Sequence, residues 1–470
     1  MTDTNTALIE PAVLERTLAE AMRHGGEFAE VFAEERQSTG ISLDDRRVEE
    51  LSTGRDRGAG IRVVVGDTTG FAHTGDLSER GLLAAAEAAA AVARRGGSGV
   101  REVALEGRHV PSPNHVTTYP ELVPKADKVQ VLLRADDAAR AAGNAIVQVS
   151  AGYGDSRRRF VVANSSGLLS SDDQVRTRLF VMCVASGDTG MQTGYESVAY
   201  TIGFELFDRI SIEETAEKAA QRAISKLAAR PAPSGVVPVV IKSGTGGILF
   251  HEACGHGLEA DHIVKDASAY AGRLGELVAS PLVTLVDDGT VADNWGSAAI
   301  DDEGHPSQRN VLIENGVLTD YMWDYLRARK DGRASSGNGR RQSYQHLPMV
   351  RMTNTYLLAG QEDPEEIVAQ TPTGVYVAQL GGGQVNTATG DFVFGMTEAY
   401  LIEDGHITEP LRDANLIGNG PDVLAKIDAV GNDFGMCPGT CGKDGQSVPV
   451  GCGQPTLRVT GVTVGGTADA

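Results

Sequence analysis

The chain has 470 residues, 41% of them hydrophobic and 22% charged, as is typical of a soluble globular protein with two or three domains. Its 42 basic and 63 acidic residues give a net charge of −21, which argues against nucleic acid or an anionic membrane as the main partner. No apolar run approaches the roughly eighteen residues of a membrane-spanning helix, and residues 1–26 lack the features of a secretory signal. Five cysteines, an odd number, fit a reducing compartment, so we expect a cytoplasmic protein.

The first half of the chain combines helical and strand-like segments. Ser78 is a suitable N-cap for an alanine-rich helix, and Ser211 followed by Glu214 indicates a capping box for another. Residues 68–70 predict a turn between strands. Helices are predicted over residues 10–24, 79–95 (ended by Gly96 and Gly97), 127–142 and 212–229. Strand-like segments cover residues 28–34, 40–51 and 60–65, followed by short β-runs across 145–206.

Residues 230–235 form the clearest break in the chain, because two prolines and a glycine follow a long helical segment. We therefore place a domain boundary there. Residues 1–230 are expected to form an α/β domain, and residues 236–470 a β-rich domain that carries a helix with candidate metal-binding residues, at 250–259. The fold class is then α+β with two domains.

The second half is predicted to be rich in strands. Residues 236–241 predict a strand, and a glycine-rich turn at 243–247 leads from it into a helix. This turn lacks the Gly-Lys-Ser/Thr ending of a phosphate-binding loop, so we expect no nucleotide role. Asn-Gly at 315–316 and Asp-Gly at 404–405, each between alternating residues, predict two-residue hairpins.

The strongest candidate for a catalytic site is the segment of residues 250–259. His251, Glu252 and His256 lie there on one short segment predicted to be helical. Zinc hydrolases use neutral imidazoles to hold the ion and a nearby carboxylate to accept a proton from water. The spacing H-E-x-x-x-H is one residue longer than the familiar H-E-x-x-H. The alternative interpretation is a chance match between ordinary histidines.

The extra residue constrains the backbone. In a regular helix, residues five apart point roughly 140° away from each other, too far to share one ion. A π-bulge would bring His251 and His256 to one face, and Gly255 would ease such a distortion. The motif therefore predicts a metal site only if the helix is irregular.

A catalytic zinc usually has three protein ligands and one open position. Glu259 could bind the metal or orient an imidazole from behind. Residues 435–446 form a glycine-rich segment, predicted to be a loop, in which Cys437 or Cys441 could be the third ligand and Lys443 would favour a thiolate. The alternative is a surface loop with incidental cysteines. Further candidates near the motif are Cys254, Asp261 and His262.

Several segments together resemble the TldD/PmbA metallopeptidases, in particular the TldD-like subunit. The similarity runs in order over nearly the whole chain and is strongest after residue 236. The co-occurrence of these motifs is far more specific than H-E-x-x-x-H alone. The segments are residues 250–252, 256–259, 351–355, 395–400, 441–446, 451, 453–456 and 464–467.

The resemblance implies a zinc peptidase in which His251, His256 and Cys441 bind Zn²⁺ and Glu252 is the general base. The expected substrates are short or unfolded polypeptides, held extended inside an enclosed chamber. The resemblance also implies a related PmbA/TldE-like subunit as partner, with a homodimer as the alternative. The N-terminal domain would then contribute to the chamber and to partner contacts.

Other features leave alternatives open. Cys254, Cys437 and Cys452 depart from the family pattern, and their roles are not assigned. One rival function is a non-catalytic, zinc-stabilised binding or regulatory protein, although a purely structural site would not need Glu252 beside the first histidine. A second rival is a metal-dependent hydrolase of a non-peptide amide.

Overall fold

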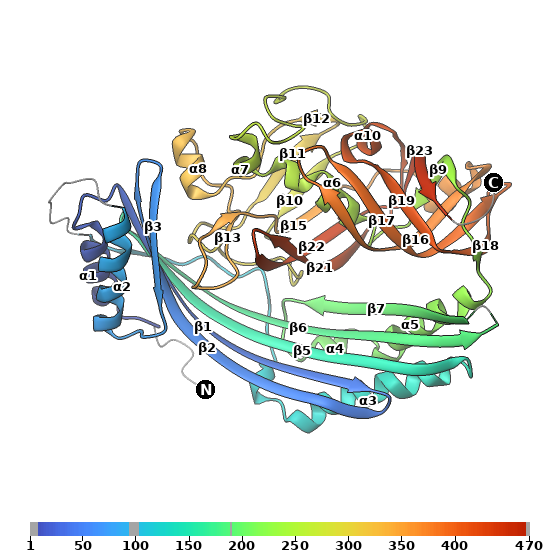
Figure 1. Ribbon diagram of the computed structural model, residues 1–470, viewed down its shortest axis with the longest axis horizontal. Coiled ribbons are helices and arrows are strands. Elements are labelled where there is room, and N and C mark those ends of the chain that lie inside the picture. Colours follow the sequence, from blue (N-terminus) through green and yellow to red (C-terminus); the bar gives the residue numbers. More distant parts are fainter. Residues whose placement is uncertain (1–7, 94–102, 189, 467–470) are drawn as a thin grey trace.

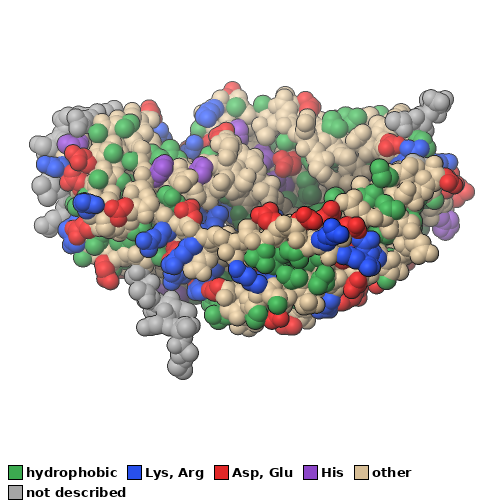
Figure 2. All heavy atoms as spheres, turned by 60° about the horizontal axis from the view of Figure 1, so that its bottom comes forward, with side chains coloured by type: hydrophobic (Ala, Val, Ile, Leu, Met, Phe, Trp, Pro, Cys, Tyr) green, Lys and Arg blue, Asp and Glu red, His purple; other side chains and the backbone are tan. Residues whose placement is uncertain are grey.

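The computed structural model describes residues 8–93, 103–188 and 190–466. A curved sheet from the N-terminal half lies along one side of the molecule, and the C-terminal half packs above its concave face (Figure 1). The space-filling view shows charged side chains of both signs over one face, with a hollow near the middle (Figure 2). The mixed α+β class predicted from the sequence is confirmed.

The N-terminal strands are β1 (Phe28–Asp44), β2 (Arg47–Val65), β3 (Thr68–Thr74), β4 (Glu106–Arg108), β5 (Ile146–Asn164), β6 (Leu168–Gly187) and β7 (Gly190–Tyr200). They form a seven-stranded sheet in the order β3-β2-β1-β5-β6-β4, and β7 also pairs with β6. Every pairing is antiparallel except that of β4 with β6. The sheet is therefore built mainly from successive hairpins.

The helices of this half are α1 (Pro11–Met22), α2 (Glu79–Val92), η1 (Pro120–Leu122), α3 (Lys125–Ala141), α4 (Leu206–Arg209) and α5 (Ile212–Leu227). The four long helices match the predicted ones, and the Ser78 and Ser211 side chains accept hydrogen bonds from the amides of Gly81 and Glu214 as N-caps should. The predicted stop at Gly96 and Gly97, with Arg95, lies outside the described residues.

Side-chain alternation along the strands assigns the two faces of the sheet. Odd-numbered residues of β1, such as Val31 and Ile41, pack with helices α1, α2, α3 and α5. Even-numbered residues such as Phe32 and Phe160 face the C-terminal half and pack against Tyr344. One face is thus covered by helices and the other by the rest of the chain.

The C-terminal half contains two larger sheets. The first has the order β12-β11-β10-β15-β22-β21, from β10 (Leu285–Asp288), β11 (Arg309–Glu314), β12 (Val317–Leu318), β15 (Asn354–Leu357), β21 (Gly435–Lys443) and β22 (Gln446–Gln454). The second contains β8 (Arg230–Pro231), β9 (Gly235–Ile241), β16 (Thr373–Asn386), β17 (Asp391–Glu403), β18 (His406–Arg412), β19 (Ala414–Asn419), β20 (Ile427–Val430) and β23 (Leu457–Gly465). Pairing of β16 with both β9 and β17 closes five of these strands, β16-β9-β23-β19-β17, into a ring.

Shorter elements complete this half. The two-stranded sheet pairs β13 (Gly339–Arg340) with β14 (Met349–Val350). The helices are α6 (Gly247–Ala253), η2 (Gly255–Leu258), α7 (Ala260–Ile263), α8 (Tyr325–Lys330), α9 (Pro364–Ala369) and α10 (Gly420–Ala425). Within the described ranges, no helix is long and apolar enough to cross a membrane.

Several strand predictions were wrong in extent. The expected segment 40–51 spans a chain reversal at Asp45 and Arg46, which both have positive φ. The reversal placed at residues 68–70 occurs at Gly66 and Asp67 instead, and the short β-runs of 145–206 are the long strands β5, β6 and β7. The hairpins at 315–316 and 404–405 are confirmed, with positive φ at all four turn residues.

The predicted domain boundary at residues 230–235 stays a prediction. Within that segment, Arg230 and Pro231 form strand β8, which pairs with β18 of the C-terminal sheet.

Candidate metal site

Helix α6 is held close to the β21–β22 hairpin by Gly247. A Cβ atom at Gly247 would lie 2.2 Å from the backbone nitrogen of Gly453 on β22, so only glycine permits this approach. The helix carries His251 and Glu252, and β21 carries Cys441. The glycine turn predicted before the helix therefore brings two distant parts of the sequence together.

The predicted irregularity of the motif is present, but it is not a π-bulge. Helix α6 ends at Ala253, Cys254 has φ −124° and ψ −50°, and a 3₁₀ turn follows over Gly255–Leu258. The rings of His251 and His256 lie 5.2 Å apart between centroids at 82°. The glycine at 255 permits a close contact, since an added Cβ would lie 2.2 Å from Met352 Sδ.

Cys441 completes a group of three possible metal ligands. One ligand atom from each of His251, His256 and Cys441 lies within 4.8 Å of the others, and all three residues are buried. The Cys441 Sγ lies 3.3 Å from His256 Nε2. The segment predicted as a loop is strand β21, in which Cys441 pairs with Val448 of β22.

These residues fit a bound metal ion. Both ring nitrogens of His251 are buried without a hydrogen-bond partner among the described residues, although a buried polar group normally has one. Two imidazoles and one thiolate form a donor set that suits zinc, whose structural and catalytic sites use nitrogen and sulfur ligands. A metal ion would satisfy the otherwise unpaired imidazole.

Glu259 orients His256 from behind. Its Oε2 lies 2.9 Å from His256 Nδ1 and accepts a 2.7 Å hydrogen bond from Lys443 Nζ. Burial alone would raise the pKa of Glu259, but His256 and Lys443 lower it to about 2, so it is an ionised acceptor. An Nδ1–H donated to this carboxylate leaves Nε2 free toward Cys441.

Lys443 does not have the expected role beside the thiol. Its ammonium group donates to Glu259 and, at 2.8 Å, to Asp261. Burial alone would raise the pKa of the Cys441 thiol, but the imidazoles of His251 and His256 lower it to about 4. The thiolate is therefore stabilised by the histidines, whereas the lysine donates to Glu259, Asp261 and the Val350 carbonyl.

Glu252 lies at the more open side of the group. Its side chain is 30% exposed, and its Oε2 is 3.7 Å from His256 Nε2. The carboxylate is thus beside the predicted ligands and accessible to water.

The remaining cysteines lie around this group. Cys254 is buried in the core, where its thiol contacts Tyr270. Cys437 pairs with Cys452 across β21 and β22, and Cys437 lies four residues from Cys441 along β21, so all three thiols are on the same face of the hairpin. His262 is a quarter exposed and lies 3.9 Å from Glu259.

Sequence reasoning gave no role to Arg351. This fully buried side chain donates a 2.5 Å hydrogen bond to the backbone carbonyl of Cys441. Its partner is a backbone atom 90 residues away, so no local pattern could indicate the contact. Only its presence in a segment of the family resemblance pointed to it.

Comparison with known families places the chain in a class of metallopeptidases. Family models for three successive domains match the chain: PmbA/TldA metallopeptidase domain 1 at residues 29–93, the central domain at 118–227 and the C-terminal domain at 234–466. The chain therefore belongs to the PmbA/TldA metallopeptidase family. The predicted family and enzyme class are confirmed.

Named relatives cover most of the chain. A protein of Haemophilus influenzae named "Metalloprotease TldD homolog" is 40% identical over 94% of this chain and 93% of its own length. A Saccharolobus solfataricus protein named "Zinc metalloprotease TldD homolog" is 31% identical over 67% of this chain and 68% of its own.

Solved structures share the fold. A Thermotoga maritima protein described as a candidate modulator of a DNA gyrase has a TM-score of 0.79 at 23% identity, covering 97% of this chain and 99% of its own. TldE from Thermococcus kodakarensis has a TM-score of 0.73 at 21% identity, covering 96% and 99%. The roles predicted for individual site residues remain predictions.

Proposed function

We propose that this chain is a zinc-dependent peptidase in which His251, His256 and Cys441 bind the zinc ion. The observation that carries the proposal is the convergence of three ligand atoms within 4.8 Å, together with the unpaired nitrogens of buried His251. The name of the Saccharolobus relative supports the choice of zinc. When bound, the ion would supply Lewis-acid polarisation of the scissile carbonyl.

Glu252 is the general base in this proposal. Its partly exposed carboxylate accepts a proton from the attacking water, whose oxygen forms the new bond to the carbonyl carbon. As the carbon–nitrogen bond breaks, Glu252 returns that proton to the leaving amine. Glu259 keeps the Nδ1 proton on His256, so the ring presents Nε2 throughout.

The proposed substrates are short or unfolded polypeptides. An extended peptide can pair its backbone with a strand edge, which gives affinity without strong sequence preference. The hollow in Figure 2 would become an enclosed chamber when a second subunit covers it. The proposed partner is a related PmbA/TldE-like chain, supported by the likeness to TldE, and a second copy of this chain is the alternative.

Replacement of Glu252 tests the enzyme against a zinc-stabilised binding protein. Glu252→Gln should retain zinc and the fold but reduce peptide cleavage at least about a hundredfold, the scale for loss of a general base. Zinc content, circular dichroism and digestion of an unstructured peptide measure these properties. Glu276→Gln, at an exposed site paired with Arg273, is the matched control. Undiminished cleavage by Glu252→Gln would remove this residue from the mechanism.

Association is tested by co-expression with a PmbA/TldE-like chain, followed by light scattering. The chain should elute in a complex with that subunit and cleave peptides there. A fully active monomer would contradict the proposed chamber. A homodimer with full activity would support the alternative partner.

A further inference from the structure

A cavity of about 190 Å³ lies between the N-terminal sheet and the C-terminal half. The β21–β22 hairpin lines it with the side-chain face of Thr440, Ser447 and Pro449 and also with Val448 between them. Because side chains alternate along a strand, Thr440, Ser447 and Pro449 point away from the face that carries Cys441 and its partner Val448. The cavity is therefore separate from the metal site, on the opposite face of the same hairpin.

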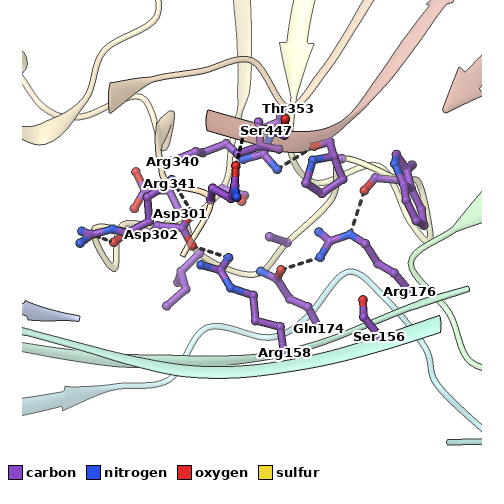
Figure 3. Close-up of a pocket in the computed structure, with 18 of the residues that line it drawn as sticks. Ser156, Arg158, Gln174, Arg176, Asp301, Asp302, Arg340, Arg341, Thr353 and Ser447 are labelled. Atoms are coloured by element: carbon purple, nitrogen blue, oxygen red, sulfur yellow. Dashed lines mark hydrogen bonds and ion pairs between the residues drawn. The ribbon is translucent and has the colours of Figure 1, made fainter. Parts of the chain in front are cut away.

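The N-terminal sheet contributes the floor of this cavity. Its lining residues are all even-numbered and lie on the face turned toward the C-terminal half; they are Arg36, Ser156, Arg158, Gln174 and Arg176. Figure 3 shows Arg158, Gln174 and Arg176 rising from the sheet toward Arg340 and Ser447.

Positive charge is in excess around the cavity. Five arginines line it, but only two carboxylates do, those of Asp301 and Asp302. Asp302 accepts hydrogen bonds from the Arg158 guanidinium, at 2.8 Å, and from the Arg341 amide. In the described part of the chain, Asp301 accepts only backbone amides, those of Glu303, His305 and Gly339. Among the described residues, neither carboxylate forms an ion pair with Arg36, Arg176 or Arg340, although the charge of Asp302 favours the protonated forms of Arg36 and Arg340 at longer range.

Arg36, Arg176 and Arg340 have no carboxylate within ion-pair distance among the described residues. They donate to neutral acceptors: Gln342 O, Trp295 O, Gln174 Oε1, Met352 O and Pro449 O. Asp172, whose charge favours protonated Arg176, is already bound by Gln174 Nε2 and the Ala299 amide.

Burial makes these unpaired charges costly. Arg176 is 7% exposed and Arg340 is 8% exposed. Burial and the neighbouring arginines lower the pKa of Arg176 to about 9, and burial lowers that of Arg340 to about 10. Arg158 Nη2 is also buried without any hydrogen-bond partner among the described residues. An anion in the cavity would offset this cost.

We propose that the cavity binds a small oxyanion, either a phosphate group or the carboxylate at a peptide C-terminus. Guanidinium forks match both groups in geometry and charge. The cavity volume of about 190 Å³ corresponds to about six water molecules at roughly 30 Å³ each, so an oxyanion of this size fits. Thr440 and Ser447 are exposed, so the ligand can enter beside the hairpin. This site is independent of the proposed zinc chemistry.

Isothermal titration of the full-length protein tests the site. The probes are inorganic phosphate, N-acetyl-dialanine with a free carboxylate, and the same dipeptide as its amide. Arg176→Gln should weaken binding of the oxyanion at least tenfold, because it removes a charge-assisted donor. Arg178→Gln, at an exposed position two residues along the same strand, should leave the affinity within twofold.

A second variant avoids the risk that Arg176→Gln disturbs folding. Ser447→Asp places a carboxylate at the exposed mouth of the cavity and should weaken binding at least tenfold. If phosphate binds and the dipeptide acid binds no better than its amide, the cavity is a phosphate site. If only the dipeptide acid binds, it is a carboxylate site. The proposal is overturned if no probe binds, if both variants bind as the unaltered protein does, or if Arg178→Gln weakens binding equally.

Discussion

Each of the three predicted ligands is positioned differently. His256 is fixed by Glu259 at 2.9 Å, and the Cys441 backbone is fixed by strand pairing and by Arg351. Among the described residues, no hydrogen bond holds the His251 ring, so its orientation depends on packing and on whatever it ligates. The Cys441 thiolate is stabilised by both imidazoles and brings strand β21 into the site beside the motif of His251 and His256.

Substitution of the cysteines distinguishes the ligand from its neighbours. Cys441→Ser should lose most bound zinc and all peptidase activity, because a serine hydroxyl replaces the thiolate that completes the set. Cys437→Ser and Cys452→Ser should retain both, since neither belongs to the convergent group with the histidines. Zinc content of the three purified variants decides the question. Full occupancy in Cys441→Ser would transfer the ligand role to Cys437 or Glu259.

At the scale of elements, sequence reasoning succeeded where the signal is local. Helix caps such as Ser78 and the two-residue hairpins depend on neighbouring residues and were predicted correctly. The reversal at Asp45 and Arg46 was missed because neither residue is glycine, although both adopt positive φ. Asp-Gly at 444–445 is a hairpin signal of the same kind, and it indicates that β21 is a strand and not a loop.

The candidate site was predictable only in part for the same reason. His251, Glu252 and His256 form a local motif, but Cys441 is 185 residues from His256. The glycine-rich segment offered Cys437 or Cys441 as candidates, and the family resemblance distinguished Cys441 from Cys437. The expected π-bulge does not occur, because helix α6 ends at Ala253. His256 lies instead on the 3₁₀ turn η2 that follows. Lys443 was misjudged because its partners, Glu259 and Asp261, become neighbours only in the folded chain.

The contact between α6 and β22 can be tested at Gly247. Gly247→Ala would place Cβ 2.2 Å from a backbone nitrogen, so helix and strand must separate. We expect a loss of about 1–3 kcal/mol in the free energy of unfolding, the scale of overpacking, together with weaker zinc binding. Gly442→Ala is the control because its added Cβ meets no atom within 4 Å. Equal stability and zinc affinity in both variants would contradict the role of this contact.

At the scale of the whole molecule, buried ion pairs join the N-terminal sheet to the C-terminal half. Arg62 lies between Glu30, at 2.8 Å, and Glu303, at 2.7 Å, and Arg341 also binds Glu30. Arg158 joins Glu34 and Asp302 in the same way. Each half alone would hold buried charges whose partners belong to the other half. Loss of one ion pair should therefore destabilise both halves together.

Glu303→Gln measures this coupling. Four buried charges balance when Arg62, Arg341, Glu30 and Glu303 are intact, and the variant leaves both arginines sharing the single carboxylate of Glu30, with one positive charge in excess. Breaking one side of a buried pair costs about 3–5 kcal/mol, so the free energy of unfolding in a denaturant titration should fall by that amount. The double variant Glu303→Gln/Arg62→Met also removes the excess cation, leaves Arg341 paired with Glu30, and should recover much of the loss. Glu213→Gln, which breaks the exposed pair with Arg134, should cost less than about 1 kcal/mol. If Glu303→Gln costs no more than that control, the ion pairs do not hold the two halves together.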